Sequence, residues 1–484
     1  MEKVMSFSEL SDTLGARLFA GEGKQTADFC SDFRSMGFSS VSIDSRTLLP
    51  GALFVAIRGS SMDGHRFVEA AFKAGASGAM VDLLAMEDSS LCLAALVQKW
   101  KGVLVVVENT LKGLQNAAAA YLAGFSNLVR VGITGSSGKT TTKEIAAAII
   151  SGEKSVVMNP GNMNSETGLP LSVFNVRPCH EIGIFEAGMN HPGEIEVLAK
   201  ILNPHVALIT NIGSAHIGIF GSSRAIAEEK KKIFSSFTGN NTALIPADDA
   251  FRNFLAEGVR GRTVFYGPST LPALGDVKGL GLDGTEITWG GEAVRFCLPG
   301  KFNLPNVLAA AALAGEFNIS AASVRKGIAS VKPLFGRGEI LRGRVTLIRD
   351  CYNSNPESAS MALDFCDGVE WPGRKIYVMG SMLELGSSSR EAHIELGRRL
   401  ASSGGDMVFL YGDEIRCAAD AMEESAGGKR KLPARNFFHT SDRGELSRSL
   451  DSYVREGDLV LLKASRGCEL ESLTEMLLGG KSGS

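Results

Sequence analysis

A glycine-rich loop ending in lysine is the feature that most constrains the fold of this chain. Residues 131–144 read VGITGSSGKTTTKE, with an apolar run before the loop and a helical pattern after it. Backbone N–H groups at such a strand-to-helix turn converge on one point and bind anionic oxygens. The common phosphate-loop pattern has glycine five positions before Gly138, where this chain has Ile133. The sequence therefore predicts an anion site on an α/β sheet, with a shorter glycine spacing.

The residue types in the loop fit a nucleotide triphosphate. Glycine lets the backbone approach a phosphate without a Cβ in the way, lysine reaches the terminal phosphates, and the threonine hydroxyl is a ligand for Mg²⁺. The alternative is a glycine turn that merely precedes a helix. The dipeptide Asn-Lys, needed for the guanine-reading motif of GTPases, does not occur in the chain. We expect ATP to be bound by Gly135, Ser136, Ser137, Gly138, Lys139, Thr140 and Thr141.

The chain alternates β-like runs with helical stretches along most of its 484 residues. Such alternation predicts parallel sheets covered by helices on both faces. We expect three domains: a smaller N-terminal α/β domain (1–127), a central phosphate-loop domain with a parallel sheet (128–335) and a C-terminal Rossmann-like α/β domain (336–484). The polar segment 425–431 is predicted to be a surface loop and 479–484 a tail.

Composition narrows the class of protein further. The formal net charge of -3 gives no bulk attraction to nucleic acid or to an anionic membrane. The eight cysteines are scattered without a C-x-x-C pair, which is typical of a reducing compartment rather than of a disulfide framework. The N-terminus lacks a secretory apolar segment, and no apolar run approaches the roughly 20 residues of a membrane helix. We expect a cytoplasmic protein without membrane insertion.

Polar residues follow several of the predicted strands. Glu186 ends the run GIFE, His216 follows VALITN, and Asn162 and Asn164 follow SVVMN. Ligands of open α/β sheets bind beyond the carboxyl ends of the strands, so these side chains are candidates for divalent-metal and substrate contacts. A lone histidine suits Mn²⁺ better than Mg²⁺. The alternatives are a histidine at the surface and a glutamate that caps the next helix; the charged run 228–234 is typical of a solvated helix face.

The chain resembles the ATP-dependent Mur ligases of peptidoglycan synthesis. The family loop T-G-x-x-G-K-[ST] matches residues 134–140, and further matches are IFEAGMNHPGEI, TNIGSAHI, GKFNLPNVLAAAAL, FGRGE, DCYNSNPES, GSMLELG, KASR, DSR, GALFVAIRG and DGHRF. The Y-N-x-N-P-x-S segment and GSMLELG are typical of the members that join D-alanyl-D-alanine to UDP-N-acetylmuramoyl-tripeptide. The resemblance therefore implies these two substrates, ATP with two Mg²⁺ ions, an acyl-phosphate intermediate, a role in cell-wall growth and division, and a monomer.

Two other ligase activities remain open at this point. One is that of the sister ligase adding the third amino acid of the peptide, diaminopimelate or lysine. That ligase typically has a His-Thr-Pro segment where this chain has Asn353 to Pro356. The other activity is that of a folylpolyglutamate-synthase-like ligase. A nucleotide-binding regulatory protein without ligase chemistry is disfavoured because Glu186, His216 and Lys230 are all present.

The resemblance implies roles for individual residues. Lys139 and Thr140 hold the ATP phosphates and one Mg²⁺, while Glu186 and His216 bind metal. Lys230 matches a lysine that is carbamylated in the family, which turns a cation into a metal-binding anion. Lys139, Glu186, His216 and Lys230 would carry the reaction. The remaining ATP contacts implied are Asn303 and Asn306 near adenine, Arg337 at the terminal phosphates and Asp350 at the ribose.

The resemblance also implies substrate contacts and shows two departures. The substrate contacts are Ser45, Arg46, Asn162, Asn164, Asn353, Asn355, Ser465 and Arg466. For Arg46, a surface turn with a salt-bridged arginine is the alternative. The family commonly has histidine at Phe302 and glycine at Ala464. A phenylalanine ring can still stack on adenine, whereas alanine would shift a close backbone approach.

Overall fold

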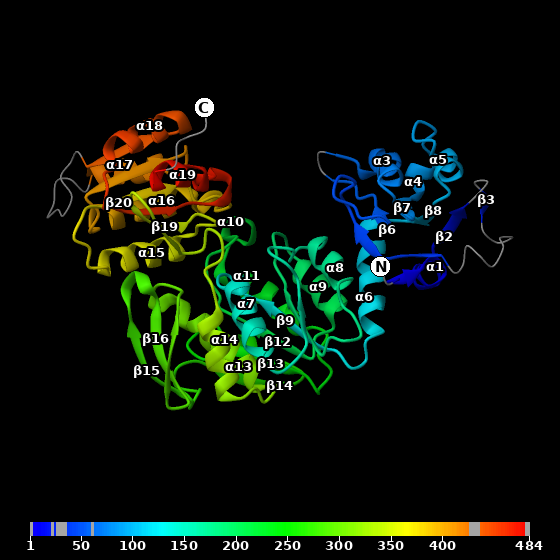
Figure 1. Cartoon of the computed structure of the whole chain (residues 1–484), viewed down its shortest axis with the longest axis horizontal. Helices are drawn as coiled ribbons and strands as arrows, with labels where there is room; N and C mark the ends of the chain where they lie inside the picture. The colour runs from blue at the N-terminus through cyan, green and yellow to red at the C-terminus, as the bar shows by residue number, and fades with distance from the viewer. Residues whose placement is uncertain (1–2, 21–23, 26–35, 60–61, 425–435, 480–484) are drawn as a thin grey trace.

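The computed structural model describes residues 3–20, 24–25, 36–59, 62–424 and 436–479. Three α/β bodies follow one another along the chain. In Figure 1 the N-terminal body lies at the upper right, the C-terminal body at the upper left and the central body below, between them. The predicted surface loop at 425–431, and the predicted tail apart from Gly479, lie outside the described residues. In the part of the chain that is described, no helix is long and apolar enough to cross a membrane.

The N-terminal sheet is mixed, with strand order β3-β2-β8-β7-β6-β5. Its four strands β5 to β8 are parallel, whereas β2 and β3 add antiparallel edge strands. A separate pair, β1 and β4, is antiparallel. The strands are β1 (Met5–Ser6), β2 (Arg17–Ala20), β3 (Lys24–Gln25), β4 (Gly37–Phe38), β5 (Ser40–Ser42), β6 (Ala52–Val55), β7 (Gly78–Asp82) and β8 (Val103–Val107); the helices are α1 (Phe7–Leu14), α3 (Val68–Lys73), α4 (Leu83–Glu87), α5 (Leu93–Trp100) and α6 (Thr110–Ala123).

The central sheet is fully parallel, with strand order β10-β11-β9-β12-β13-β14. The strand before the glycine-rich loop, β9, lies between β11 and β12. The strands are β9 (Val129–Thr134), β10 (Val156–Met158), β11 (Ile182–Glu186), β12 (Val206–Ile209), β13 (Thr242–Pro246) and β14 (Arg262–Tyr266). A small antiparallel sheet follows, made of β15 (Leu274–Gly279), β16 (Thr285–Trp289) and β17 (Glu292–Phe296).

Helices cover both faces of the central sheet, as its continuous apolar strands predict. Alternate residues of β12 point to opposite faces: Leu208 packs with α7, α13 and α14, whereas Ile209 packs with α9 and α11. Both faces are therefore buried, and ligands can reach the sheet only at its ends. The helices are α7 (Lys139–Ile150), α8 (Gly168–Val173), α9 (Glu194–Leu202), α10 (Ile217–Phe220), α11 (Ser223–Lys231), α12 (Arg252–Ala256), α13 (Leu304–Gly315) and α14 (Ala321–Ser330).

The C-terminal sheet has the order β18-β19-β23-β20-β21-β22 and is parallel except for β18. The alternation had predicted parallel strands throughout. Only residues 343–345 link β18 to β19, which is too short for a parallel crossover, so the pair forms a hairpin. The strands are β18 (Glu339–Arg342), β19 (Thr346–Asp350), β20 (Lys375–Gly380), β21 (Met407–Tyr411), β22 (Phe437–Thr440) and β23 (Leu459–Lys463); the helices are α15 (Pro356–Gly368), α16 (Ser389–Ala401), α17 (Arg416–Glu424), α18 (Arg443–Tyr453) and α19 (Thr474–Leu478).

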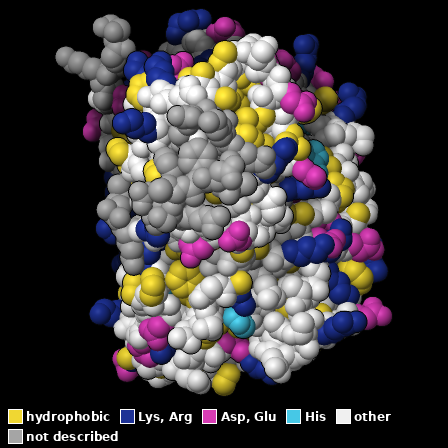
Figure 2. Space-filling model, turned by 90° about the vertical axis from the view of Figure 1, so that its right-hand side faces the viewer, with side chains coloured by type: hydrophobic (Ala, Val, Ile, Leu, Met, Phe, Trp, Pro, Cys, Tyr) yellow, Lys and Arg dark blue, Asp and Glu magenta, His cyan; other side chains and the backbone are white. Residues whose placement is uncertain are grey.

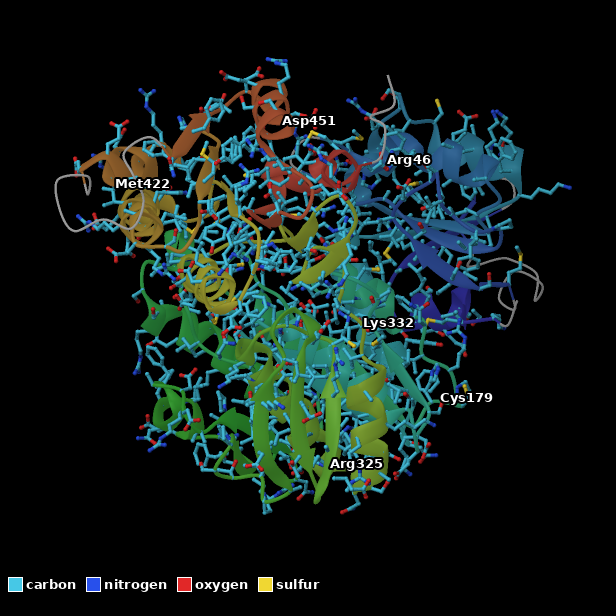
Figure 3. All side chains as sticks on the ribbon, turned by 60° about the vertical axis from the view of Figure 1, so that its left-hand side comes forward. Arg46, Cys179, Arg325, Lys332, Met422 and Asp451 are labelled. Atoms are coloured by element: carbon cyan, nitrogen blue, oxygen red, sulfur yellow. The ribbon has the colours of Figure 1, made fainter. Side chains whose placement is uncertain are left out.

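A packed helix connects the N-terminal body to the central one, whereas a segment without a helix or strand connects the central body to the C-terminal one. Helix α6 packs on α8 and α9 of the central body (Figure 1), and its Tyr121 hydroxyl donates to the Val176 carbonyl at 2.7 Å. The predicted domain limit at 127/128 lies between α6 and β9, and the limit at 335/336 lies between α14 and β18. The segment after α14, which begins near Lys332 (Figure 3), is the link to the C-terminal body.

Candidate active site

Two glycines give the loop after β9 its shape. Gly135 has φ 153° and Gly138 has φ 77°. A Cβ on Gly135 would lie 1.8 Å from Thr210 Oγ1, and one on Gly138 would lie 2.1 Å from Asn306 Oδ1. Both positions therefore require glycine for close approach, which is the reason the sequence suggested.

Two residues that follow β12 form hydrogen bonds with the backbone of the loop. The Thr210 hydroxyl donates to the Ser137 carbonyl at 2.6 Å. The Asn211 amide both donates to that carbonyl and accepts from the Ser137 N–H, each at 3.0 Å. Neighbouring side chains thus hold the loop in shape. The helix that follows it, α7, begins at Lys139, where the sequence shows a helical pattern.

Two lysine ammonium groups meet at the base of the loop. Lys139 Nζ and Lys230 Nζ each donate to the Gly135 carbonyl at 2.9 Å. Burial, and then the charge of Lys139, lowers the pKa of Lys230 well below its usual value, and Lys230 is 1% exposed. Burial also lowers the pKa of Lys139, with a smaller contribution from Arg337. Two lysines that share one carbonyl make a site that favours an added anion, because an anion would stabilise their charged forms.

The neighbouring lysines of the charged run have other partners. Lys231 donates to the Phe254 carbonyl at 2.7 Å, and Lys232 pairs with Glu229 at 2.7 Å. Among these three lysines, Lys230 is therefore the one that contacts the loop. The sequence predicted a solvated helix face for the run 228–234. Lys230 departs from that prediction because its side chain is buried.

Glu186 lies beside the loop and has a free oxygen. The β9–β11 register pairs it with Ile133, and its side chain is 1% exposed. Oε1 accepts from the Asn164 amide at 2.6 Å, whereas Oε2 is buried without a hydrogen-bond partner among the described residues. A buried carboxylate oxygen next to a phosphate loop fits a divalent cation. Thr140 is also buried and lines one cavity with Glu186. Its hydroxyl is of the kind that such an ion binds.

His216 enters the site from the loop after β12. Its backbone is left-handed, with φ 65°, and its Nδ1 lies 3.2 Å from Glu384 Oε2 of the C-terminal domain. Burial, followed by the charges of Lys139 and Lys230, lowers the pKa of His216 to about 4. The imidazole is therefore neutral at physiological pH, the form that can bind a metal.

Replacing His216 is expected to change how stability depends on pH. Its folded pKa of about 4 lies below the ordinary 6.5, so the unfolded chain binds more protons between these values and stability falls as the pH drops through this window. The free energy of unfolding of the wild type is therefore lower at pH 5 than at pH 7 by about 2 kcal/mol. His216→Gln should show a correspondingly smaller loss in urea unfolding without nucleotide or metal. His191→Gln, at an exposed histidine, is the control. An equal loss of stability in the wild type and in His216→Gln would contradict the prediction.

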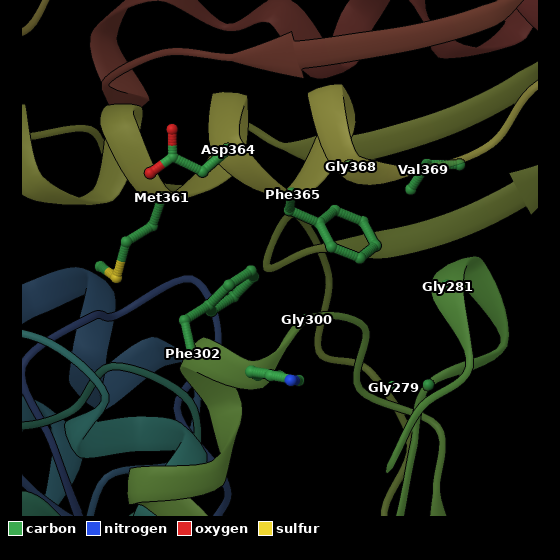
Figure 4. Close-up of a pocket in the computed structure, with 11 residues that line it drawn as sticks. Gly279, Gly281, Gly300, Phe302, Met361, Asp364, Phe365, Gly368 and Val369 are labelled. Carbon is green, nitrogen blue, oxygen red and sulfur yellow. The ribbon is translucent and has the colours of Figure 1, made fainter.

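Asn303 and Asn306 stand on the opposite side of the loop, at the start of α13. Asn306 donates to Asn303 Oδ1 at 3.3 Å, and Asn303 donates to the Pro299 carbonyl at 2.8 Å. The next residue toward the domain border, Phe302, makes an edge contact with Phe365 of α15, with ring centroids 6.1 Å apart. Phe302 lines both the main cavity and a second one of ≈ 440 Å³, shown in Figure 4. An aromatic side chain thus stands where the family commonly has histidine.

The C-terminal domain contributes the far wall of the site. Asp350, the last residue of β19, pairs with Lys463 at 2.9 Å, and Lys463 also donates to the Asn353 carbonyl at 2.9 Å. Asn355 caps α15 by accepting from the Ser358 N–H at 2.8 Å. Its side chain is therefore committed to the helix, although it also lines the cavity.

One cavity of ≈ 940 Å³ brings most of the predicted residues together between the central and C-terminal domains. Those that line it are Ser136, Ser137, Gly138, Lys139, Thr140, Thr141, Asn162, Asn164, Glu186, His216, Asn303, Asn306, Arg337, Asp350, Asn353, Asn355 and Arg466. Gly135, in the loop, and Lys230 do not line this cavity, and the Lys230 ammonium donates to the Gly135 carbonyl. Ser465 lies inside the domain, where its hydroxyl donates to the Ser354 carbonyl at 3.3 Å.

Ser45 and Arg46 are the two predicted residues that stand apart. They lie in the N-terminal domain, where Figure 3 labels Arg46, and do not line this cavity. Arg46 forms a two-pronged ion pair with Asp44, at 2.7 and 2.9 Å. Hydrogen bonds from Arg46 lower the pKa of Asp44 to about 2. The salt-bridged turn considered as the alternative is what the structure contains, and an anion contact by Arg46 stays a prediction.

Sequence reasoning missed a buried support behind Glu186. Lys143, which is fully buried on α7, donates to the carbonyls of Asn159 and Gly161 at 2.6 and 3.2 Å. Asn159, also fully buried, accepts from the Glu186 N–H and donates to the Glu186 carbonyl. No periodicity marks these two residues. Their only signal is the chemistry of a lysine on the buried face of a helix.

The central and C-terminal domains touch at a pair of glycines. A Cβ on Gly218 of α10 would lie 2.3 Å from the Gly386 backbone nitrogen. Nearby, Ser214 donates to Glu357 through its hydroxyl at 2.5 Å and its N–H at 3.0 Å. The two domains are therefore in backbone contact at this edge of the cavity.

Gly218→Ala is expected to separate the two domains at this contact. Keeping the contact with a Cβ in place would cost about 1–3 kcal/mol, which a contact between domains can avoid by opening. Small-angle scattering should show a larger radius of gyration than in the wild type. Gly315→Ala, at a position with open space around it, is the control. An unchanged radius in Gly218→Ala would show that the glycine contact does not hold the domains together.

The chain belongs to the Mur ligase family. The pattern of the Mur ligase family catalytic domain matches residues 38–122, the Mur ligase middle domain matches 133–314, and the Mur ligase glutamate ligase domain matches 336–466. The sequence is 41% identical, over 94% of this chain and 96% of the relative, to the UDP-N-acetylmuramoyl-tripeptide–D-alanyl-D-alanine ligase of Treponema pallidum.

Solved structures extend this likeness to the whole fold. MurF from Acinetobacter baumannii matches with a TM-score of 0.84 and 25% identity, covering 99% of both chains. The MurF ligase of Thermotoga maritima in complex with ADP matches with a TM-score of 0.73 and 29% identity, covering 91% of this chain and 97% of that one. The predicted family, its three-domain fold and its ligase class are thereby confirmed.

Proposed function

We propose that this enzyme joins D-alanyl-D-alanine to UDP-N-acetylmuramoyl-tripeptide at the expense of ATP, in the synthesis of peptidoglycan precursors. The observation that carries the proposal is the shared cavity, which places the phosphate loop, Glu186 and His216 opposite Asp350, Arg337 and Arg466. The name and 41% identity of the Treponema relative favour this reaction over the addition of a third amino acid or of glutamate to folate.

The reaction needs activation because a carboxylate is a poor electrophile. The γ-phosphoryl group of ATP passes to the terminal carboxylate oxygen of the tripeptide, with release of ADP. The amine of D-alanyl-D-alanine then attacks the acyl carbon, an amide bond forms, inorganic phosphate leaves and the amine loses a proton. Lys139 and Arg337 supply positive charge where the phosphoryl group moves, which stabilises the transition state.

The residues around the loop organise this transfer. The backbone N–H groups of the first turn of α7, which have no partner within the helix, would meet the phosphates. The network of Lys143 and Asn159 keeps Glu186 in place. We assign Mg²⁺ to Glu186, His216, Thr140 and, once carbamylated, Lys230; two ions are proposed, with Mn²⁺ as an alternative. When bound, the ion neutralises phosphate charge. Holding the acyl phosphate beside the amine lowers the remaining barrier through proximity.

The other partners follow from the substrates. We place the uridine diphosphate end of the precursor on the N-terminal domain and the reaction in the cytoplasm, where ATP is available. On the face shown in Figure 2, basic and acidic side chains are intermingled rather than gathered in a basic patch, in keeping with the net charge of -3. We therefore propose neither nucleic acid nor membrane as a partner, and a monomer as the working unit.

One assay tests the proposed reaction. Phosphate release from ATP is measured with UDP-N-acetylmuramoyl-tripeptide and D-alanyl-D-alanine together, and then with each omitted. Release only in the complete mixture is expected, and parallel reactions with diaminopimelate and lysine tripeptides would identify the third residue. Release with glutamate, diaminopimelate or a folate as the added substrate instead would overturn the proposal.

A further inference from the structure

Arginines and aromatic rings alternate beside the link between the central and C-terminal domains. The guanidinium carbon of Arg337 lies 4.1 Å from the centre of the Tyr352 ring, and that of Arg466 lies 5.6 Å from the same ring. A guanidinium within about 6 Å of a ring face is attracted by the ring quadrupole. One side chain, Tyr352, therefore contacts two cations that line the active-site cavity.

A second ring extends this arrangement into the link itself. Phe335 is 50% exposed, and Arg349 lies 4.1 Å from its ring centre and Arg466 lies 6.0 Å from it. Arg466 thus contacts two aromatic rings, that of Phe335 in the link and that of Tyr352. The backbone fixes the same neighbourhood, because the Tyr352 N–H donates to the Gly336 carbonyl at 3.0 Å.

The three arginines differ in their acidic partners. Arg349 pairs with Glu339 at 2.6 Å and Arg466 with Glu471 at 3.0 Å. Within the described ranges, Arg337 has no carboxylate partner, so its positive charge is uncompensated by a neighbouring acid. The Tyr352 ring is the contact that holds the Arg337 guanidinium, and it does so without neutralising it.

We propose that Tyr352 is a positioning residue of this ligase. Its ring sets the spacing between Arg337, which meets the terminal phosphate of ATP, and Arg466, which meets the incoming dipeptide. An aromatic ring suits this task because it attracts both cations while leaving their N–H groups free for anions. The assignment rests on the proposed function for the roles of the two arginines. It adds that one side chain couples the phosphate side of the site to the amine side.

The test compares Tyr352→Leu with Tyr352→Phe. Tyr352→Leu removes the ring and is expected to lower kcat/KM for D-alanyl-D-alanine about 10-fold, chiefly through KM. It should also weaken binding of a β,γ-methylene ATP analogue, measured by calorimetry, while leaving ADP affinity within about two-fold, because Arg337 meets the terminal phosphate. Tyr352→Phe keeps the ring and should restore most of both losses.

Tyr453→Leu is the matched control, since Tyr453 carries Arg374 at 4.6 Å from its ring centre, on α18. It should leave both readouts near the wild-type values. Equal losses for the analogue and ADP, or no rescue by phenylalanine, would overturn the positioning role. A folded Tyr352→Leu variant with unchanged KM would also overturn it. Failure of the proposed function would instead appear as a wild type without substrate-dependent phosphate release.

Discussion

Lys139→Met is expected to lower kcat/KM for ATP by roughly 10³-fold, because removing one preorganised charge from a phosphoryl-transfer site has an effect of that order. The ammonium group has no carboxylate partner among the described residues and lies on the same carbonyl as Lys230. Burial disfavours this charge more than Glu186 favours it, so an anionic phosphate would stabilise the ammonium form further. Steady-state phosphate release measures the loss.

Stability separates this role from a structural one. Burial lowers the pKa of Lys139, so its charged form is disfavoured in the folded protein. In protein freed of CO₂, where Lys230 is an amine and not a carbamate, removing the Lys139 side chain relieves this cost. We expect Lys139→Met to unfold in urea at the same concentration as the wild type or a higher one. Lys154→Met, at an exposed lysine paired with Glu181, is the control and should keep full activity. Residual activity within ten-fold of the wild type would contradict the prediction.

The sequence predicts the loop and its strand well because their signals are local. The apolar run before the loop forms β9 at Val129–Thr134, and the helical pattern after it forms α7 at Lys139–Ile150. Glu186 was placed near the loop for a physical reason: parallel strands end at one edge, and the β9–β11 register brings it there.

The remainder of the site depends on contacts between distant residues. Ser214 and Glu357 are 143 positions apart and meet only because two domains pack together. The buried pair Lys143 and Asn159 has no pattern of its own, since one lies on a helix and the other in a loop. Ser465 illustrates the converse: a motif residue predicted to bind substrate has its hydroxyl bonded to the Ser354 carbonyl inside the domain.

The carbamylation of Lys230 stays a prediction, and the surroundings of this lysine favour it. A carbamate forms when a neutral amine adds to CO₂ with loss of a proton, so the amine must be unprotonated. Burial and the charge of Lys139 lower the pKa of Lys230 and favour that form. The resulting anion would lie beside Lys139 and attract its ammonium group.

Lys230→Met is accordingly expected to lower kcat by roughly 10³-fold or more, because it removes both the carbamate and the metal ligand it provides. Wild-type protein equilibrated with ¹³CO₂ should show a carbamate signal in ¹³C NMR that Lys230→Met lacks. Lys231→Met is the matched control, since the adjacent lysine donates to the Phe254 carbonyl and not to the loop; it should keep both the signal and the activity. Loss of activity without any carbamate signal in the wild type would leave Lys230 essential but as an amine, and the metal would then depend on Glu186, His216 and Thr140 alone.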